Sequence, residues 1–268
     1  MMDATLGFVG AGNFTEALIR GLCMAGVERT RLLVTTRSRL DRLEALQRQW
    51  GVVPMRDKAE LCRAASILIL AMKPQDLHEA MQELAPAVTS RHLLISVLAG
   101  VPAAAVERYV DGAPVIRAMP NLPMAVRAGA TAIACGRHVR DEHRAQARAL
   151  FDLVGETVEV SEEWMNAVTA VSGSGPAYVY LLIEALIEAA VAVGMPLEPA
   201  RALALQTVLG AARLVRDTGA DPADLRHRVT SPGGTTRAAL AVLEARGFKP
   251  AVIEAVRRAT ERARELGA

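Results

Sequence analysis

Two glycine-containing turns in this sequence combine residue types that suit the binding of an anion. The first lies in GFVGAGNFTEAL, where an apolar run ends and an amphipathic stretch begins. Gly10 can make the tight turn, and Gly12 lets backbone N–H groups at a helix start approach a pyrophosphate, with Asn13 and Phe14 beside it. Thr15 replaces the third glycine of the dinucleotide-binding fingerprint, so the match is incomplete. A tight turn without a ligand is the alternative.

The second turn, VTSPGGTT, interrupts a helical region near the C-terminus with a proline and two adjacent glycines. We expect a helix to begin near Thr235, so that its unpaired N–H groups and the positive end of its dipole can hold a carboxylate. Gly233 and Gly234 let the backbone close on the ligand, while Ser231 and Thr235 add hydroxyl or backbone donors. A small amino-acid-like anion fits such a nest. A helix cap with no chemical role is the alternative.

The residues after the second apolar run, LLVTTRSR, indicate which dinucleotide would bind. An NAD site usually places a carboxylate there for the ribose 2′-hydroxyl, whereas an NADP site offers hydroxyl and arginine donors to a 2′-phosphate. Thr35, Thr36, Arg37, Ser38 and Arg39 supply donors and no acid. The prediction is NADPH, with NADH accepted at lower preference; a solvated basic turn is the alternative.

Two further turns follow apolar runs, in LILAMKPQD and LLISVLAGV. In an open α/β sheet, ligands bind outside the carboxyl ends of the strands, so both turns should face the cofactor. RAMPNLP, at 117–123, is a third turn, stiff enough to shape the floor of a pocket. The cofactor contacts expected from the first two turns are Ala71, Met72, Lys73, Pro74, Ser96 and Ala99.

The elements that must position these turns follow from the hydrophobic pattern. The first part of the chain alternates short apolar runs with amphipathic stretches, which is typical of parallel strands separated by helices. After about residue 161 helical periods dominate. We therefore predict an α/β fold class, with an N-terminal Rossmann-type doubly wound, mainly parallel sheet at residues 1–161 and an all-helical domain at 162–268. The helices expected are 13–24, 40–50, 75–84, a short one after Pro102, 164–171, 176–193, 197–216, 222–228, 236–246 and 250–266.

One predicted helix, PAYVYLLIEALIEAAVAVGM, is apolar around most of its circumference. A helix with one face in water would be more amphipathic, so we expect this helix to be buried in a dimer. The segment carries Glu184 and Glu188, which argues against a membrane span.

Composition limits the remaining function classes. The chain has 268 residues, 51% of them hydrophobic, and a net charge of +2 with its arginines spread out, so no nucleic-acid partner is predicted. The N-terminus has no basic segment before its apolar stretch, and Cys23, Cys62 and Cys135 lack metal-ligand spacing. We expect a cytoplasmic protein with reduced thiols and no metal site.

The motifs together resemble those of the pyrroline-5-carboxylate reductases. GFVGAGNFTEALIRGL, AMKPQ, SVLAGV, RAMPNLP, SGSGPAYVY and VTSPGGTT occur in the order and at about the separations of that family, over essentially the whole chain. The resemblance implies NADPH-dependent reduction of the cyclic imine 1-pyrroline-5-carboxylate to L-proline, the last step of proline biosynthesis. It implies a Rossmann domain and a helical dimerisation domain, with the helices of two subunits interlocked and the active site at their junction. It also allows a decamer of five dimers.

By the same resemblance, VTSPGGTT is the substrate loop, and Thr236 directs its hydroxyl at the ring nitrogen as the catalytic residue. Four positions depart from the family pattern. Thr15 stands where alanine is usual, and Leu122 where threonine is common. His227 stands where an aspartate often precedes VTSPGG by a few residues, and Lys58 where a related asparagine normally touches the adenosine portion of the cofactor.

Two other functions stay open at this stage. Another NADP-dependent imine or hydroxyacid oxidoreductase could share the two-domain plan, but a β-hydroxyacid dehydrogenase would need a lysine in the first long helix of the helical domain, and Trp164 to Gly194 contains none. A non-enzymatic NADPH-binding sensor would leave VTSPGGTT without a purpose.

Overall fold

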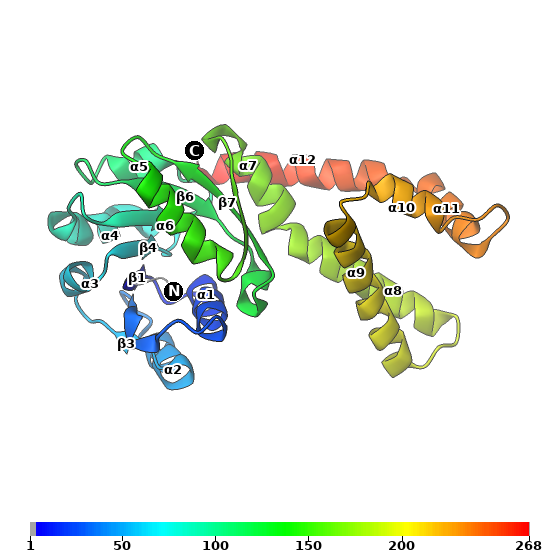
Figure 1. The fold of residues 1–268 in the computed structure, drawn as a ribbon, viewed down its shortest axis with the longest axis horizontal. Coiled ribbons are helices and arrows are strands. Elements are labelled where there is room, and N and C mark those ends of the chain that lie inside the picture. Colours follow the sequence, from blue (N-terminus) through cyan, green and yellow to red (C-terminus); the bar gives the residue numbers. More distant parts are fainter. Residues whose placement is uncertain (1–3, 268) are drawn as a thin grey trace. The chain divides into compact units, whose positions relative to one another are not determined.

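The structure, a computed structural model, describes residues 4–267 and divides into two compact units (Figure 1). One unit holds the chain up to Ser174 together with the stretch from Arg258 onward, and the other is Gly175–Arg257. The boundary expected from the sequence, at 161/162, marks the change from strands to helices, whereas contacts divide the chain at 174/175. The extent of the domains as functional parts therefore stays a prediction.

The first unit is built on an eight-stranded sheet of order β3-β2-β1-β4-β5-β6-β7-β8. All neighbouring strands run parallel except β6 and β7, which are antiparallel. The prediction of a Rossmann-type, mainly parallel sheet is confirmed. The strands are β1 (Leu6–Val9), β2 (Leu32–Thr35), β3 (Val53–Pro54), β4 (Ile67–Leu70), β5 (Leu93–Ser96), β6 (Val115–Met119), β7 (Gly129–Cys135) and β8 (Gly155–Glu159).

Side chains that alternate along the strands form a core on each face of this sheet. Phe8 and Ile69 belong to one buried cluster, which also contains residues of α1 (Asn13–Met24), α2 (Leu40–Trp50) and α6 (Asp141–Asp152). Their chain neighbours Val9 and Leu70 belong to a second cluster, together with residues of α3 (Lys58–Ala64), α4 (Leu77–Leu84) and α5 (Ala103–Glu107). Both faces are therefore covered, and this explains why the strands are apolar throughout.

The helices at 13–24 and 40–50 have the bounds that the sequence predicted. Among the described strands and α-helices, three were not predicted. The strand β3 has only two residues, one of them a proline, which is too short for a periodic signal. The helix α3 has seven residues. The helix α6 is rich in polar and charged residues and has only a narrow buried face, which includes Leu150 and Phe151.

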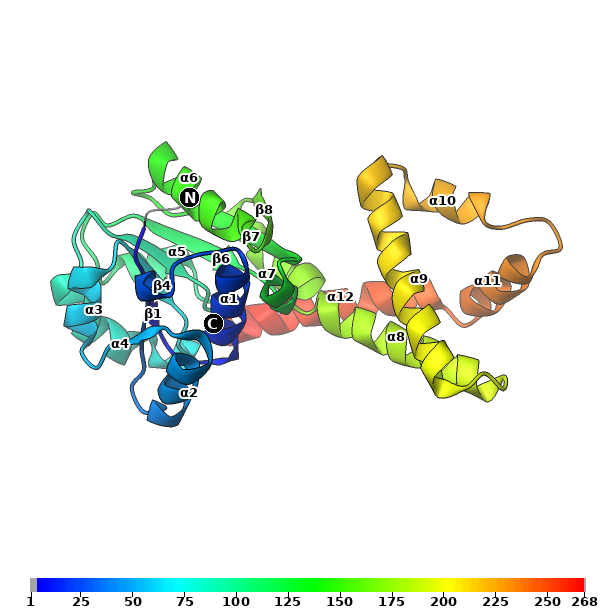
Figure 2. The ribbon, with the colours of Figure 1, turned by 60° about the horizontal axis from the view of Figure 1, so that its bottom comes forward.

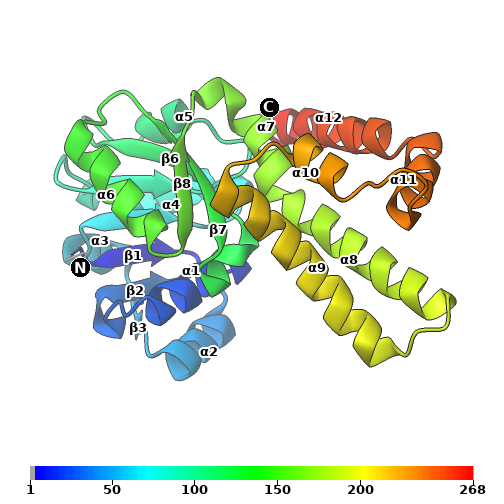
Figure 3. The ribbon, with the colours of Figure 1, turned by 45° about the vertical axis from the view of Figure 1, so that its right-hand side comes forward.

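The second unit contains only helices, as predicted. Figures 2 and 3 show α8 and α9 lying side by side as an antiparallel pair. Upstream of this unit, α7 (Met165–Val168) runs through a π-helical turn at Thr169–Gly173 into α8. The helices are α8 (Gly175–Ala192), α9 (Leu197–Thr218), α10 (Pro222–Arg228), α11 (Thr235–Ala245) and α12 (Phe248–Gly267), the last of which continues into the first unit.

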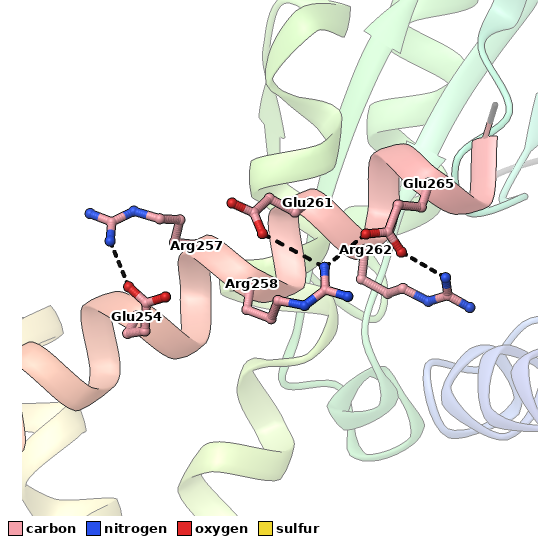
Figure 4. A network of polar contacts seen from close by, with 6 residues as sticks. All are labelled: Glu254, Arg257, Arg258, Glu261, Arg262 and Glu265. Carbon is pink, nitrogen blue, oxygen red and sulfur yellow. Dashed lines mark hydrogen bonds and ion pairs between the residues drawn. The ribbon is translucent and has the colours of Figure 1, made fainter.

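The last helix carries ion pairs along its own length (Figure 4). The Arg262 guanidinium contacts Glu265 at 2.7 Å, and Arg258 contacts the same carboxylate at 2.9 Å. These hydrogen bonds hold the pKa of Glu265 below its ordinary value. Each exposed ion pair of this kind adds little stability, so these pairs stabilise the helix itself only slightly.

Apolar side chains cover much of the surface of α8 and α9. Leu181 is 66% exposed on α8, and Leu209 is 61% exposed on α9. The stretch Glu162–Ala192 is long and apolar enough to cross a membrane by length and composition, with a mean hydropathy of 1.5 over its most apolar window. A single such helix is weak evidence for a span. Packing against a second copy of the chain explains this apolar surface more simply than a membrane does, because the helices of the second copy present equally apolar faces.

We therefore expect the protein to sediment as a dimer or a larger assembly at micromolar concentration in analytical ultracentrifugation. Leu182→Glu, on the exposed face of α8, should shift the population toward monomer, since it places a carboxylate in the covered surface. Glu198→Gln, a change at an exposed position of α9, is the control and should leave the assembly unchanged. A wild-type protein that is monomeric at this concentration would contradict the expectation.

Candidate functional site

A cavity of ≈ 540 Å³ lies in the first unit, beside the turns that follow β1, β2 and β4. This is the edge of a parallel sheet at which ligands bind in doubly wound folds. The lining includes eight of the predicted cofactor residues: Gly10, Gly12, Asn13, Thr36, Arg37, Ala71, Met72 and Lys73. Residues from three separate turns therefore meet at one cavity.

The turn after β1 is held by close backbone packing. Gly10 has a φ of +123°, and a Cβ on it would lie 2.5 Å from the carbonyl oxygen of Ala71. The Gly10 N–H donates to the Thr35 carbonyl oxygen at 2.9 Å, and the Thr15 hydroxyl donates to the Gly10 carbonyl oxygen at 2.7 Å. Thr15, one of the departures from the family pattern, is fully buried and so stabilises this turn.

Gly12 is the N-cap of α1, and no side chain within the described part of the molecule caps this helix. Its φ of −84° suits any residue, so its backbone does not require glycine. A Cβ at Gly12 would meet no atom within 4 Å. The first amides of α1 are therefore open toward the cavity side, as a pyrophosphate site requires.

The cavity is lined by five cationic side chains and three carboxylates. Arg42 contacts Glu16 at 2.6 Å and Asn13 at 3.2 Å, and Lys58 contacts Glu83 at 2.6 Å. The full set is Arg37, Arg39, Arg42, Lys58 and Lys73 with Asp76, Glu79 and Glu83. Most of these cations are thus already paired with carboxylates.

Sequence reasoning missed Arg42 and the three carboxylates of this lining. A signal for the carboxylates was present, because Asp76, Glu79 and Glu83 are spaced by three and four residues and so share one face of the helix after Lys73. Lys58 was noted only as a departure from the family pattern.

Five predicted cofactor residues are absent from the cavity lining. Phe14 packs against the core, and Thr35 is buried, where its carbonyl holds the Gly10 turn. Pro74 opens the short 3-10 helix Pro74–Asp76. Ala99 is half-buried in the turn after β5. Ser96 ends β5 with a buried hydroxyl that has no hydrogen-bond partner among the described residues.

An ion pair between a buried arginine and a half-buried glutamate lies beside the turn that follows β5. Arg117 on β6, opposite Ser96, contacts Glu162 at 3.5 Å. Glu162 also accepts a hydrogen bond of 2.7 Å from the N–H of Ala103, at the start of α5. Burial lowers the pKa of Arg117, and Glu162 acts in the opposite direction. Glu162 therefore ties the start of the region after residue 161 to a turn at the ligand-binding edge of the sheet.

The predicted pocket-floor turn, RAMPNLP, is fixed in a similar way. The Asn121 amide donates to the Ser172 carbonyl oxygen at 3.0 Å and accepts from the Ala130 N–H at 2.8 Å. Leu122, the second departure, is 54% exposed, so its side chain is not part of this framework.

The loop VTSPGGTT lies in the second unit and leads into α11 as expected. Gly233 has a φ of +71°, and the Gly234 N–H donates to the Ser231 carbonyl oxygen at 3.1 Å. Gly234 is the N-cap of α11, without a side-chain cap among the described residues. Ser231 and Thr235 are exposed, Thr236 is half-buried in the first turn, and the departure His227 is exposed on α10. The start of α11 can therefore receive an anion.

Across residues 4–267, no group of three or more His, Cys, Asp and Glu side chains is arranged to hold a metal ion. Burial raises the pKa of all three cysteine thiols, so none is activated as a thiolate.

Comparison with known proteins relates both parts of the chain to reductases. Residues 5–100 match the family described as NADP oxidoreductase, coenzyme F420-dependent, and residues 162–266 match the family described as pyrroline-5-carboxylate reductase dimerisation. The pyrroline-5-carboxylate reductase of Synechocystis is 44% identical over 99% of both chains. That of Methanosarcina acetivorans is 40% identical over 100% of this chain and 99% of its own.

Solved structures agree. A pyrroline-5-carboxylate reductase from Coxiella burnetii superposes with a TM-score of 0.89 at 37% identity, over 99% of both chains. Plasmodium falciparum pyrroline carboxylate reductase, solved with NADP bound, gives 0.90 at 30% identity over 100% of both chains. Because the similarity extends from the glycine turn to the loop before α11, the chain belongs to the pyrroline-5-carboxylate reductase family.

Proposed function

We propose that this protein reduces 1-pyrroline-5-carboxylate to L-proline with NADPH, the last step of proline biosynthesis. The observation that carries the proposal is the uncapped, glycine-led start of α11 in a chain that matches reductases of that name along its whole length. A loop of this kind suits a small carboxylate, and a nicotinamide cofactor supplies the hydride when it is bound.

In the proposed reaction, hydride adds to the imine carbon, which is C2 of the pyrroline ring and becomes C5 of proline, while the ring nitrogen is or becomes protonated. The amides after Gly234, with Ser231, Gly233 and Thr235, hold the substrate carboxylate and thereby orient the ring. The Thr236 hydroxyl hydrogen-bonds the ring nitrogen. If the substrate arrives as an iminium ion, no strong general acid is required, and Thr236 only accepts or relays a hydrogen bond.

The preference for NADPH rests on the donors that follow β2. Thr36, Arg37 and Ser38 line the cavity, and no carboxylate occupies the positions directly after β2 where an NAD site would place one. Of the residues expected from the sequence, Gly10, Gly12 and Asn13 would contact the pyrophosphate, with Ala71, Met72 and Lys73 along the rest of the cofactor. The relative solved with NADP bound supports this assignment.

The working assembly that we propose is a cytoplasmic homodimer, with a decamer of five dimers as a further level. The dimerisation family match at 162–266 and the exposed apolar side chains of α8 and α9 support the dimer. Mass measurement of the native protein distinguishes the dimer from the decamer.

One assay tests the proposed function directly. NADPH oxidation, followed by absorbance, should begin when 1-pyrroline-5-carboxylate is added, and L-proline should accumulate in equal amount. Tight NADPH binding without oxidation would instead favour a sensor. Turnover with a hydroxyacid and NADP, but none with the imine, would favour a dehydrogenase of the same plan.

Gly12→Val should abolish NADPH binding while the protein stays folded. The backbone at Gly12 accepts any residue and an added Cβ meets no atom within 4 Å, so only a ligand against the start of α1 is obstructed. We expect a loss of at least about 100-fold in affinity by fluorescence titration, because the branched side chain displaces the pyrophosphate from the helix N-terminus. Gly12→Ala should lose less NADPH affinity than Gly12→Val, because its side chain is smaller. Unchanged NADPH affinity in Gly12→Val, with a normal melting temperature, would place the cofactor elsewhere.

Arg37→Ala should reduce the ratio of kcat/KM for NADPH to that for NADH by about ten- to a hundredfold, since a charged hydrogen bond to the 2′-phosphate is lost. The kcat/KM for NADH should change little, because NADH has no such phosphate. Arg31→Ala, outside the cavity lining, serves as the control. A wild type that favours NADH, or a variant that keeps the wild-type ratio, would be incompatible with the assignment.

Thr236→Ala should lower kcat by about ten- to a thousandfold, on the scale of one oriented donor that acts chiefly in the transition state. Gly234→Val should mainly raise KM for the imine, because its side chain would crowd the Ser231 hydroxyl and obstruct the nest. NADPH affinity should stay near wild type in both, and both should remain dimers. Full kcat in Thr236→Ala, or an equal loss of NADPH and substrate binding in Gly234→Val, would contradict this role of the loop.

A further inference from the structure

The arginine assigned to the 2′-phosphate is already bound to acidic side chains across the cavity. Arg37 follows β2, and its guanidinium pairs with Glu79 of α4 and lies 3.6 Å from Asp76, which precedes that helix. Arg37 and Glu79 are 42 residues apart in the sequence, and all three side chains line the same cavity. The contact therefore links two walls of the candidate cofactor site.

The pairing recurs along the same wall. Glu83, one turn after Glu79, binds Lys58 at 2.6 Å. Asp76, Glu79 and Glu83 thus present a row of carboxylates to cations from two other elements. Because Arg37 and Lys58 both pair with carboxylates of α4, this side of the cavity is acidic along its length and not only at one contact.

A 2′-phosphate must compete with these carboxylates for Arg37. At neutral pH a phosphate monoester carries nearly two negative charges. One N–H group of the Arg37 guanidinium donates to Glu79 and is not free for the phosphate, and Asp76 adds a second negative charge 3.6 Å from the guanidinium. The same carboxylates repel the incoming dianion. NADH has no 2′-phosphate, so it can bind without displacing these contacts.

We propose that Glu79, supported by Asp76, is a specificity-determining residue that competes with the 2′-phosphate of NADPH for Arg37. Because Glu79 occupies Arg37, the preference for NADPH over NADH is smaller than the basic residues after β2 would give without it. Arg37 is 52% exposed and Glu79 53% exposed, so the pair is weak enough for a phosphate to replace. This inference rests on the proposed function in one respect, namely that NADPH binds in this cavity.

Measurements of cofactor binding in the absence of the imine test this competition directly. Glu79→Gln should bind NADPH about three- to tenfold more tightly than wild type in a fluorescence titration, because one competitor and one repelling charge are removed. Adenosine 2′,5′-bisphosphate should gain by the same factor in calorimetry, while NADH should change less than about twofold. Asp76→Asn should act in the same direction with a smaller effect, as its contact with Arg37 is longer.

Two controls separate local competition from a general change of charge. Glu28→Gln removes a carboxylate outside the cavity lining and should leave NADPH affinity unchanged. In the double variant Arg37→Ala with Glu79→Gln, the gain from Glu79→Gln should be smaller than in the wild-type background, since only the loss of the repelling charge remains.

Weaker NADPH binding by Glu79→Gln would overturn the proposal, because it would show that Glu79 orients Arg37 for the phosphate. Equal gains for NADPH and NADH, or a gain that is undiminished without Arg37, would overturn it as well. A wild type that binds NADPH but does not oxidise it with 1-pyrroline-5-carboxylate would defeat the proposed function and leave the competition standing. A wild type that does not bind NADPH would defeat both.

Discussion

The close approach of the Gly10 backbone to the end of β4 is the constraint on which the cofactor cavity depends. With a φ of +123° and the Ala71 carbonyl where a Cβ would stand, this position accepts only glycine. Hydrogen bonds from Gly10 to Thr35 and from Ala71 to Val9 then tie the ends of β1, β2 and β4 together. Because the three turns are held at fixed distances from one another, their side chains can contact one extended ligand at the same time.

Four helices of this protein show how the start of a candidate binding site differs from a structural cap. Asp57 and Asp221 cap α3 and α10, and each accepts a hydrogen bond from a first-turn amide, at 2.7 and 2.6 Å. By contrast, α1 and α11 begin at Gly12 and Gly234, with ψ angles of −179° and 167° and no side-chain cap. A glycine N-cap gives up little stability relative to aspartate, and it leaves the amides for an external anion. The two anions differ: a pyrophosphate suits the first helix and a carboxylate the second.

The sequence was sufficient to predict what depends on local pattern and motif. Helices 13–24 and 40–50, the mainly parallel sheet, and the turns that bring Gly10, Arg37 and Ala71 to one cavity all followed from periodicity and from the strand-end rule. Short or narrow-faced elements such as β3 and α6 gave too little periodic signal. Contacts between distant side chains, above all Arg37 with Glu79, could not be predicted, because they depend on how α4 packs beside the turn after β2. The pairing of Arg117 with Glu162 has the same origin.

Charge pairing in the cavity explains how a protein of net charge +2 can offer a phosphate site without a free basic patch. Unpaired cations gathered at one cavity would repel one another and would attract any polyanion. Carboxylates on neighbouring elements neutralise them instead, as Glu16 does for Arg42 and Glu83 for Lys58. An exposed pair such as Arg37 with Glu79 contributes only about 0–1 kcal/mol, so an anion that offers a better geometry can replace the carboxylate. A ligand that contacts several of these cations at once therefore binds more tightly, whereas a ligand that contacts a single cation gains little affinity. Selectivity for a dinucleotide thus arises from exchange among weak contacts at fixed positions, and the glycine turn after β1 provides those positions.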